Sequence, residues 1–408
     1  MTAPVDAFDV VIVGGGMVGA SLALGLSHTR ARVCLIESVP ADSSAQPSFD
    51  ERTTALGNAS RRIFEALGVW DPMVREAGVI RTIHVSDSGR FGFARLRAHE
   101  QGVDAFGYVI PNRVIGAALW QKLAQVPAIS IHVPARPEDL EIAGEGVRLT
   151  IVGANGAKTP VTARLVVAAD GAQSAVRAAA GIGATVEDYG QIAVVTSVES
   201  DTPQDGTAYE RFTPAGPIAV LPLRSGAYGV IWTLEPARAS EMLAAPDDVF
   251  LRELQAHFGW RAGRFVRVGK RASYPLTLSR AETTVAKRAV LIGNAAQALH
   301  PVAGQGFNLG LRDAAMLAET VARAGDDPGA PDVLEKFAEW RAQDRTGVIR
   351  FTDSLVKLFS SKIPGIGVAR NLGLLLFDLT PPAKRALARV GSGFAGPIPR
   401  MARGLPLV

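Results

Sequence analysis

Three glycines near the N-terminus have the spacing of a loop that binds a dinucleotide. Gly14, Gly16 and Gly19 form the pattern G-x-G-x-x-G between the apolar run "VVIV" and the segment "MVGASLALGL". The first glycine allows a tight turn, the second lets a pyrophosphate approach the backbone, and the third lets a helix pack on the strand. Glu37 ends the next apolar run, where a carboxylate can accept hydrogen bonds from ribose hydroxyls. This pattern predicts dinucleotide binding and does not distinguish FAD from NAD.

A second segment combines backbone freedom with small side chains. "GNAAQALHPVAGQGFNLGLRD", residues 293–313, follows the apolar run "RAVLI" and ends as an amphipathic helix. Ligands of parallel sheets bind at the carboxyl ends of strands, and a helix N-terminus offers them backbone donors. The segment therefore predicts that a bound group approaches the main chain closely. The positions that support this prediction are Gly293, Asn294, Gly304, Gln305, Gly306 and Asn308.

A third segment, "RLVVAADGAQSAVRAAAG", runs an apolar strand into Asp170 and then into a short Ala-rich helix. Asp-Gly is a common turn dipeptide, so an ordinary tight turn explains Asp170 and Gly171. A carboxylate at the end of a strand also suits a ligand site. Both interpretations stay open on the residues alone.

The segment "GSGFAG" at 391–396 repeats the spacing of the N-terminal glycines. No apolar strand leads into it, and "PIPR" follows where a helix should begin. We interpret this copy as part of the C-terminal tail.

Taken together, the three segments resemble the single-component FAD-dependent aromatic hydroxylases. The segment at 293–313 resembles the subfamily that hydroxylates polyprenylated phenols in ubiquinone biosynthesis, and the likeness covers nearly the whole chain. Four further stretches resemble the 2-polyprenyl-6-methoxyphenol hydroxylases in particular: "IHVSDSGRFGF", "YERFTPAGPIAVLPL", "FGWRAGRF" and "GKRASYPL". The wider family often has Asp where this chain has Asn294, a form that the subfamily also shows, so this position carries no charge.

The resemblance implies a set of FAD contacts. The adenosine half would lie on Gly14, Gly16, Gly19 and Glu37, and Asp170 would bond FAD and border the nicotinamide site. The pyrophosphate and the pyrimidine edge of the flavin would face Gly293, Asn294 and the backbone of Gly304, Gln305, Gly306 and Asn308.

Two arginines are also implied in the flavin site. Arg52 in "FDERTTAL" and Arg113 in "IPNRVIGAAL" would approach the flavin or its phosphates. Ordinary surface ion pairs are the alternative for both, and it stays open. We expect Asn112, which precedes Arg113, to be a helix N-cap.

The implied reaction is an NAD(P)H-dependent monooxygenation of an aromatic ring, with NADPH preferred. NAD(P)H would reduce FAD, O₂ would form a flavin C4a-hydroperoxide, and one oxygen atom would pass to the phenol ring. We expect His300 and Pro301 to shape the loop beside the flavin ring; a general-base role for His300 stays open. No second glycine motif has a strand before it, so NAD(P)H is expected to bind transiently.

The predicted fold class is α/β: a Rossmann-like FAD-binding domain with an inserted, mostly antiparallel β substrate domain and a C-terminal helical region. The FAD-binding domain comprises 1–75, 100–184 and 285–345. Residues 76–99 and 185–284, with short β-rich runs split by Gly and Pro, form the substrate domain. Residues 346–408 form the helical region.

Charge is concentrated at the C-terminal end. The chain has 408 residues, 48% of them hydrophobic, and a net charge of +4, whereas 346–408 alone contains nine Lys or Arg and two Asp. A general basic face is thus absent, which argues against nucleic-acid binding. The basic helices could contact the anionic inner face of a bacterial membrane or other ubiquinone-biosynthesis enzymes. A solvated helical cap is the alternative, and it stays open.

Cys34, the only cysteine, lies in an apolar run and is expected to be buried and inert. It excludes a disulfide framework and a dithiol flavin reductase, and it fits a reducing cytoplasm. The uncharged stretch at 10–27 is interrupted by glycines and preceded by Asp6 and Asp9, so we expect neither a membrane anchor nor a signal peptide. The six histidines have no metal-ligand spacing.

Two alternatives to the principal prediction remain. The first is a sibling hydroxylase of the same pathway that acts at another ring carbon of the polyprenylated phenol. The second is a non-catalytic, FAD-bound scaffold of a biosynthetic complex.

Overall fold

The computed structural model describes residues 6–40, 43, 46, 50, 52–299, 304–360, 376, 378–394 and 396–407. Large parallel and antiparallel sheets and long helices make up these residues. The predicted α/β fold class, with an inserted antiparallel sheet, is confirmed.

A mainly parallel sheet consists of β1 (Asp6–Val13), β2 (Val33–Ile36), β8 (Ile129–His132), β9 (Ala135–Ala143), β10 (Gly146–Gly153), β11 (Lys158–Ala168), β18 (Val285–Ala286) and β19 (Ala289–Leu291). The central strand β1 runs parallel to β2 on one side and to β11 on the other. β19 continues the parallel order beyond β11, whereas β10 and β9 form an antiparallel extension of β11.

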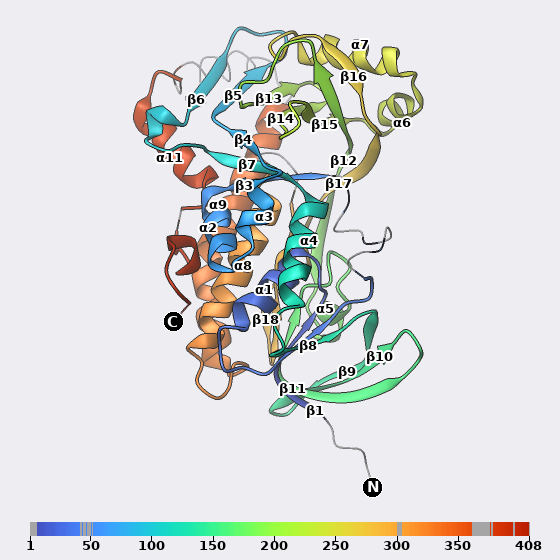
Figure 1. Ribbon diagram of the computed structural model, residues 1–408, viewed down its shortest axis with the longest axis vertical. Coiled ribbons are helices and arrows are strands. Elements are labelled where there is room, and N and C mark those ends of the chain that lie inside the picture. The colour runs from blue at the N-terminus through green and yellow to red at the C-terminus, as the bar shows by residue number, and fades with distance from the viewer. Residues whose placement is uncertain are drawn as a thin grey trace.

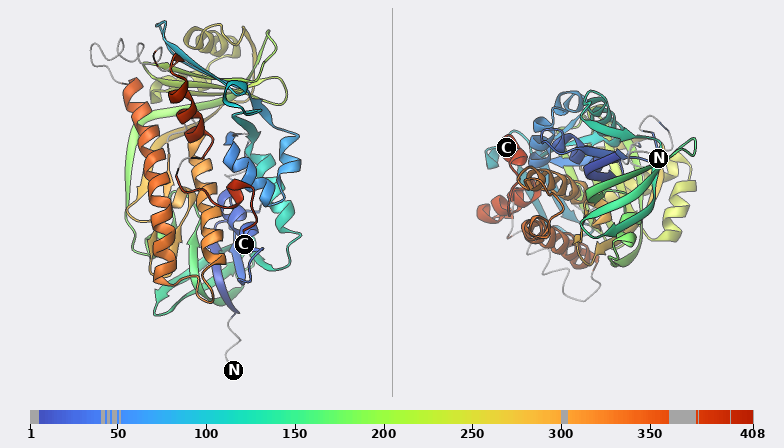
Figure 2. Two further views of the ribbon diagram at one scale, coloured as in Figure 1. Left: turned by 90° about the vertical axis from the view of Figure 1, so that its left-hand side faces the viewer. Right: turned by 90° about the horizontal axis from the view of Figure 1, so that it is seen from below.

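Helices cover one face of the parallel sheet: α1 (Met17–Leu26), α4 (Asn112–Leu123), α8 (Gln305–Ala322) and α9 (Pro331–Ser360). Along β1, Val10 and Ile12 pack into the helical core, whereas Val11 and Val13 pack against β9 and β10 on the opposite face. This alternation follows from the two-residue period of a strand. Figure 2 shows α8 and α9 side by side along the length of the molecule.

A second sheet consists of β5 (Thr82–Asp87), β6 (Phe93–Arg97), β12 (Ala184–Ser200), β13 (Thr207–Thr213), β14 (Gly216–Pro222), β15 (Tyr228–Leu234), β16 (Phe265–Val268), β17 (Ala272–Ala281) and β20 (Gln297–Ala298). Its neighbours pair antiparallel except β5 and β13, which are parallel. Helices α6 (Pro236–Ala244) and α7 (Asp247–Phe258) pack on the outer face of this sheet. Trp232 of β15 and Phe250 of α7 are buried between the helices and the sheet. In Figure 1 this sheet lies at one end of the molecule and β9 and β10 lie at the other.

Smaller elements connect the two large sheets. A short sheet consists of β3 (Thr53–Gly57), β4 (Gly78–Ile80) and β7 (Gly107–Pro111), and β4 contacts β14. The other helices among the described residues are α2 (Asn58–Ala66), α3 (Trp70–Val74), α5 (Ala175–Ala179) and α11 (Pro381–Gly391), with 3₁₀ turns η1 (His99–Gln101), η2 (Gly293–Ala295) and η4 (Met401–Arg403). α9 runs without a break across residue 345, and the predicted division into domains stays a prediction.

Local details bear on three expectations. Cys34 is fully buried, which with the charge of Asp6 raises the pKa of its thiol to about 12. Gly391 is the last residue of α11, and Gly393 and Gly396 follow it and open no helix in the described residues. The N-cap prediction for Asn112 is wrong: Pro111 is the N-cap of α4, and the Asn112 side chain accepts a hydrogen bond from Thr54 on β3 instead.

No helix in the described part of the chain has the length and apolar character needed to span a bilayer.

Candidate active site

The predicted site residues gather where parallel strands end. Gly14 directly follows β1 and Glu37 directly follows β2. Asp170 and Gly293 each lie two positions beyond the last residue of β11 and β19. Because these strands are neighbours and parallel, their carboxyl ends meet at one edge of the sheet. Segments up to 279 residues apart in the sequence, Gly14 and Gly293 among them, thus border the same region.

The turn between β1 and α1 leaves no room for side chains. Gly14 has φ of +102°, and a Cβ there would lie 2.4 Å from the carbonyl oxygen of Ala169. A Cβ on Gly19 would lie 1.9 Å from the carbonyl oxygen of Gly14. Gly16 is the N-cap of α1, and with Gly14 it lines the cavity described below. The turn therefore presents main-chain atoms to whatever occupies the cavity.

Glu37 holds this turn in place as well as lining the cavity. Its Oε2 accepts a hydrogen bond from the N–H of Gly15 at 2.5 Å, and its Oε1 accepts one from the N–H of Val39 at 2.8 Å. Trp120 of α4 donates from Nε1 to the carbonyl oxygen of Gly15 at 3.0 Å. A carboxylate has about four acceptor positions, so Glu37 retains capacity for ribose hydroxyls.

Asp170 has one oxygen engaged and one without a partner. Its Oδ2 accepts hydrogen bonds from the N–H groups of Ala175 and Val176 at the start of α5, at 2.9 and 3.3 Å. Its Oδ1 is buried and makes no hydrogen bond to the described residues. A buried unsatisfied oxygen is costly, and Asp170 lines the cavity. A ligand hydroxyl or amide would satisfy Oδ1, and FAD carries both.

The N-terminus of α8 is held by a single side chain. Asn308 Oδ1 accepts hydrogen bonds from the N–H of Gly57 and the hydroxyl of Ser60, at 2.9 and 2.6 Å. Its Nδ2 donates to the carbonyl oxygens of Ala55 and Gly304, at 2.8 and 2.7 Å. The side chain of Asn308 is therefore occupied by the protein itself, and what α8 offers to a ligand here is backbone.

Gly304 and Gln305 complete this helix start. Gly304 is the N-cap of α8 and has φ of +59°, a left-handed conformation that favours glycine. Gln305 is buried and donates from Nε2 to the carbonyl oxygen of Gly391, at 3.5 Å. Residues 304–308 all line the cavity.

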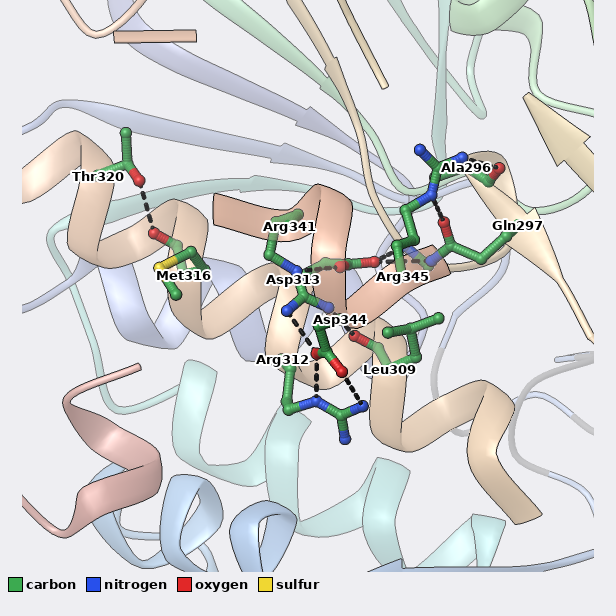
Figure 3. A network of polar contacts seen from close by, with 11 residues as sticks. Ala296, Gln297, Leu309, Arg312, Asp313, Met316, Thr320, Arg341, Asp344 and Arg345 are labelled. Atoms are coloured by element: carbon green, nitrogen blue, oxygen red, sulfur yellow. Dashed lines mark hydrogen bonds and ion pairs between the residues drawn. The ribbon is translucent and has the colours of Figure 1, made fainter. Parts of the chain in front are cut away.

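Gly293 is buried and contacts a network of charged side chains around Asp313. Its N–H donates to Asp313 Oδ2 on α8 at 3.4 Å. Gln297 donates to the same oxygen at 2.8 Å (Figure 3). Arg341 of α9 donates to Asp313 Oδ1 at 2.7 Å. The neighbouring residue Asn294 is exposed and lines the cavity. The turn after β19 is thereby fixed to α8 and α9 by charged side chains.

The same network extends to Asp344. Its carboxylate receives Arg312 at 2.8 Å and Arg341 at 2.6 Å, and all three side chains are at most 3% exposed. Burial raises the pKa of Asp344, but the charges of Arg312 and Arg341 outweigh burial and hold that pKa below its usual value. Buried ions are stable only when paired and hydrogen-bonded, as these are.

The two predicted arginines differ in position. Arg52 lines the cavity, contacts Asp50 through Nε at 2.6 Å and stacks its guanidinium over Tyr274 at 4.4 Å from the ring centre. Tyr274 in turn donates to Asp50 Oδ2 at 3.0 Å. Arg113 is exposed and is not among the residues that line the cavity. Its approach to the flavin stays a prediction.

His300 and Pro301 lie outside the described residues.

One cavity of about 1640 Å³ joins the strand ends to the second sheet. Pockets for one drug-sized ligand are ~300–1,000 Å³, so this cavity has room for a dinucleotide and a further molecule. The inner face of the sheet is mostly apolar where it borders the cavity, with Val85, Ala193, Val195, Ala208, Leu221 and Ile231. The alternate residues on these strands pack under α6 and α7.

Sequence reasoning missed three residues of this site. Trp120 and Tyr274 reach it from α4 and β17, and nothing in their local sequence indicates that contact. Glu210 of β13 lines the apolar part of the cavity, where burial raises the pKa of its carboxyl to about 7. The alternation in "TAYERFT" places Glu210 on one face of the strand, but the sequence does not show that this face is the inner one.

Comparison with known proteins agrees with this geometry. The model of the FAD binding domain family matches residues 7–352. The chain is 39% identical over 406 residues to the ubiquinone hydroxylase UbiL of Rhodospirillum rubrum, covering 98% of this chain and 93% of that protein. It is 32% identical to the 3-demethoxyubiquinol 3-hydroxylase of Escherichia coli, covering 94% and 98%.

A solved structure shares the fold. The p-nitrophenol 4-monooxygenase PnpA from Pseudomonas putida DLL-E4 superposes with a TM-score of 0.78 at 21% identity, covering 96% of this chain and 99% of that one. The family model and the cradle of backbone and carboxylate groups agree on FAD as the cofactor. The chain belongs to the FAD-dependent ubiquinone-biosynthesis hydroxylase family of flavoprotein monooxygenases.

Proposed function

We propose that this enzyme hydroxylates the aromatic ring of a 2-polyprenyl-6-methoxyphenol, with NAD(P)H and O₂ as co-substrates. One observation carries the proposal: a single cavity joins the glycine turns at the strand ends to the apolar inner face of the second sheet. A monooxygenase of this type needs both surfaces in one enclosed volume, because the ring must meet the flavin away from water.

In this proposal the strand ends bind FAD. The contacts are the turn at Gly14, Gly16 and Gly19, the carboxylates of Glu37 and Asp170, Arg52, Asn294 and the backbone at 304–308. The chemistry that FAD supplies there is acceptance of a hydride from NAD(P)H and activation of O₂. The N-terminus of α8 adds about half a positive charge, which favours an anionic ring system beside it.

The second sheet binds the aromatic ring and the start of the prenyl tail. Apolar residues such as Val85, Leu221 and Ile231 bury hydrocarbon surface, and each buried CH₂ contributes roughly 0.8 kcal/mol. The same residues exclude water from the space above the site. The protein thereby docks and orients the ring and leaves the redox chemistry to the cofactor.

A second candidate is hydroxylation of a related substrate at another ring carbon. The 32% identity to the 3-demethoxyubiquinol 3-hydroxylase of Escherichia coli favours it. Both candidates use the same cavity, and they differ in which ring carbon faces the flavin.

NAD(P)H is proposed to bind transiently near Asp170, with NADPH preferred. Contact with anionic lipid is proposed for the C-terminal region, where Arg385 and Arg389 are exposed on α11 and Leu379 is 77% exposed beside it. Co-sedimentation with anionic and neutral vesicles tests this contact: equal recovery in both would contradict it. The same region is the proposed surface for other enzymes of ubiquinone biosynthesis.

The two candidates are distinguished by comparing the turnover of two substrates. FAD-loaded protein receives NADPH, air and either a short-chain 2-prenyl-6-methoxyphenol or a short-chain 3-demethoxyubiquinol, and NMR locates the new oxygen in each product. We expect faster turnover of the methoxyphenol with oxygen para to its hydroxyl. Faster turnover of the demethoxyubiquinol would establish the second candidate. NADPH oxidation that neither phenol stimulates would contradict both and favour a scaffold.

A further inference from the structure

Glu210 places a carboxyl group in the apolar part of the cavity. On β13 the residues Ala208, Glu210 and Phe212 alternate toward the cavity, whereas Tyr209 packs against the outer core. In register with Glu210 are Val85 on β5 and Ala219 on β14, and both also line the cavity. The carboxyl group is therefore flanked by hydrocarbon on both neighbouring strands.

In the part of the chain that the structure describes, the carboxyl group of Glu210 has no protein partner. No hydrogen bond or ion pair joins it to any of the described residues. The side chain is only partly inaccessible, because it faces the cavity rather than the packed core. Burial by the surrounding protein raises the pKa of the carboxyl group from 4.5 to about 7.

The charged and titratable side chains that line the same cavity are otherwise Glu37, Arg52, Arg136, Asp170 and Tyr274. Glu37 and Asp170 follow strands of the first sheet, and Arg52 directly precedes β3 of the short sheet. Arg136 lies on β9 and Tyr274 on β17. On the two strands paired with β13, the cavity-lining positions are the apolar Ile83, Val85, Ala219 and Leu221. α11 adds the apolar Leu387 and Ala388. No ion on these elements compensates Glu210 within the described residues.

A purely structural role does not explain such a residue. Burying a polar group without a partner is destabilising, and burying a carboxylate without one is more so. Val85 and Ala219 would pack equally well beside an apolar residue. A partner that arrives with the ligand accounts for the carboxyl group.

We propose that Glu210 binds the phenolic hydroxyl of the aromatic substrate and accepts its proton during hydroxylation. This inference rests on the proposed function, because it requires a phenol in the cavity. It adds a catalytic residue to the reaction and fixes which edge of the ring faces β13.

The proton transfer is balanced within the site. The O–H bond of the phenol breaks, the proton passes to the carboxylate of Glu210, and the electron pair stays on the phenol oxygen. Delocalisation of that pair makes the ring carbons ortho and para to the oxygen more nucleophilic. When the product phenol forms, the proton returns, and Glu210 is again a carboxylate.

The match of acid strengths supports this role. A phenol such as the tyrosine side chain has a pKa of about 10, and an ordinary carboxylate at about 4 is a weak base for it. Burial raises the pKa of the Glu210 carboxyl group to about 7, which is closer to the pKa of a phenol. A substantial fraction of the carboxyl group is still ionised at neutral pH.

The test uses FAD-loaded enzyme with Glu210→Gln and Glu210→Asp. The matched control is Glu199→Gln, a carboxylate on β12 of the same sheet that is 53% exposed and paired with Arg267. Retention of FAD and the thermal midpoint show that each variant is folded. The probes are a short-chain 2-prenyl-6-methoxyphenol and its methyl ether, which lacks the hydroxyl. Their dissociation constants are measured from the change in flavin absorbance, without NADPH.

The binding result is independent of turnover. We expect the wild type and Glu199→Gln to bind the phenol about tenfold more tightly than the ether, since a hydrogen bond to a charged group is worth about 1.5–3 kcal/mol. Glu210→Gln should lose most of this preference. Equal preference in Glu210→Gln and the wild type would overturn the inference.

The activity result separates a proton acceptor from a mere contact. In the wild type kcat/KM should fall as the pH drops below about 7, because Glu210 becomes protonated. Glu210→Gln should lose this acid limb and about 100-fold in kcat, the scale of general acid–base catalysis. Glu210→Asp should keep the limb. An unchanged pH profile in Glu210→Gln, with wild-type product formation intact, would overturn the inference alone. No product from the wild type would overturn the proposed function and the inference with it.

Discussion

Asn308 on α8 donates a hydrogen bond from Nδ2 to the carbonyl oxygen of Ala55 on β3 at 2.8 Å, across 253 residues of sequence. The same side chain also engages Gly57, Ser60 and Gly304. These hydrogen bonds connect the start of α8 to β3 of the short sheet, which also lines the cavity. The cavity wall at 304–308 is thus positioned by a polar side chain at 2% exposure.

Replacement of Asn308 by Ala should weaken both the fold and FAD binding. The substitution strands the N–H of Gly57 and the hydroxyl of Ser60, and each stranded buried group costs about 1–3 kcal/mol. Denaturant unfolding and the FAD dissociation constant are the measurements. The control is Asn155→Ala, which removes an exposed turn contact and should change stability by less than about 0.5 kcal/mol. Equal effects of the two substitutions would contradict this account.

Gly19→Ala should give colourless protein. The added Cβ would lie 1.9 Å from the carbonyl oxygen of Gly14, so α1 must move away from the turn that receives the pyrophosphate. Flavin absorbance per protein after purification measures the loss. Gly347→Ala is the matched control, because it adds a methyl group to the exposed side of α9 with nothing within 4 Å. That control should retain FAD and gain up to about 1 kcal/mol of stability. Yellow Gly19→Ala protein would show that the turn tolerates a side chain.

Asp344→Asn should destabilise the protein strongly at neutral pH. It leaves Arg312 and Arg341 buried without their shared carboxylate, and breaking a buried pair costs about 3–5 kcal/mol. Asp248→Asn, which removes an exposed pair with Arg252, should have little effect.

The pH dependence of the Asp344 effect has a defined sign. The pKa of Asp344 is lower in the folded protein than its usual 3.8, so its stabilisation is present above that value. It is lost as the pH falls through the lowered pKa. The difference in unfolding free energy between wild type and Asp344→Asn should therefore shrink below about pH 4. A constant difference down to pH 2 would be inconsistent with an ionised Asp344.

Glu210 should have the opposite effect on stability. Its pKa is raised from 4.5 to about 7, so folding favours the protonated form. The contribution of protonated Glu210 to the free energy of unfolding is fully present below about pH 4.5. It is lost as the pH rises through about 7. The thermal midpoint of Glu210→Gln should exceed that of the wild type increasingly from pH 5 to pH 8. A difference in thermal midpoint that stays constant from pH 5 to pH 8 would contradict the raised pKa of Glu210.

The local patterns that lie within one strand–turn–helix unit were predictable. The spacing of Gly14 and Gly19 predicts the first turn because the close approach of Gly19 to the Gly14 carbonyl oxygen lies within that unit, as does the bond from Gly15 to Glu37. The bond from Trp120 to the same turn comes from a distant helix and was not predictable. The glycine at the N-cap of α8 was also predictable from its local sequence. The contacts of Asn308 with Ala55 and Gly57, which hold this helix start, were not. Buried thiol chemistry at Cys34 also followed from its apolar neighbours.

Contacts between distant segments were not predictable in this way. The inward direction of Glu210 depends on the pairing of β13 with β5 and β14, and only that register defines the inner face. Asn112 was expected to cap its own helix, but Thr54 on the adjacent strand offers it a partner that the sequence does not reveal. The ion pairs of Asp313 and Asp344 with Arg341 depend on the packing of α8 against α9, which the sequence alone does not define.

The most direct test of the proposed function is incorporation of ¹⁸O from labelled oxygen gas. FAD-loaded protein is incubated with NADPH, ¹⁸O₂ and a short-chain 2-prenyl-6-methoxyphenol, and the product is analysed by mass spectrometry. The account predicts a product with one ¹⁸O atom, formed only when both NADPH and the phenol are present. Consumption of NADPH with release of labelled peroxide and no labelled phenol would contradict it.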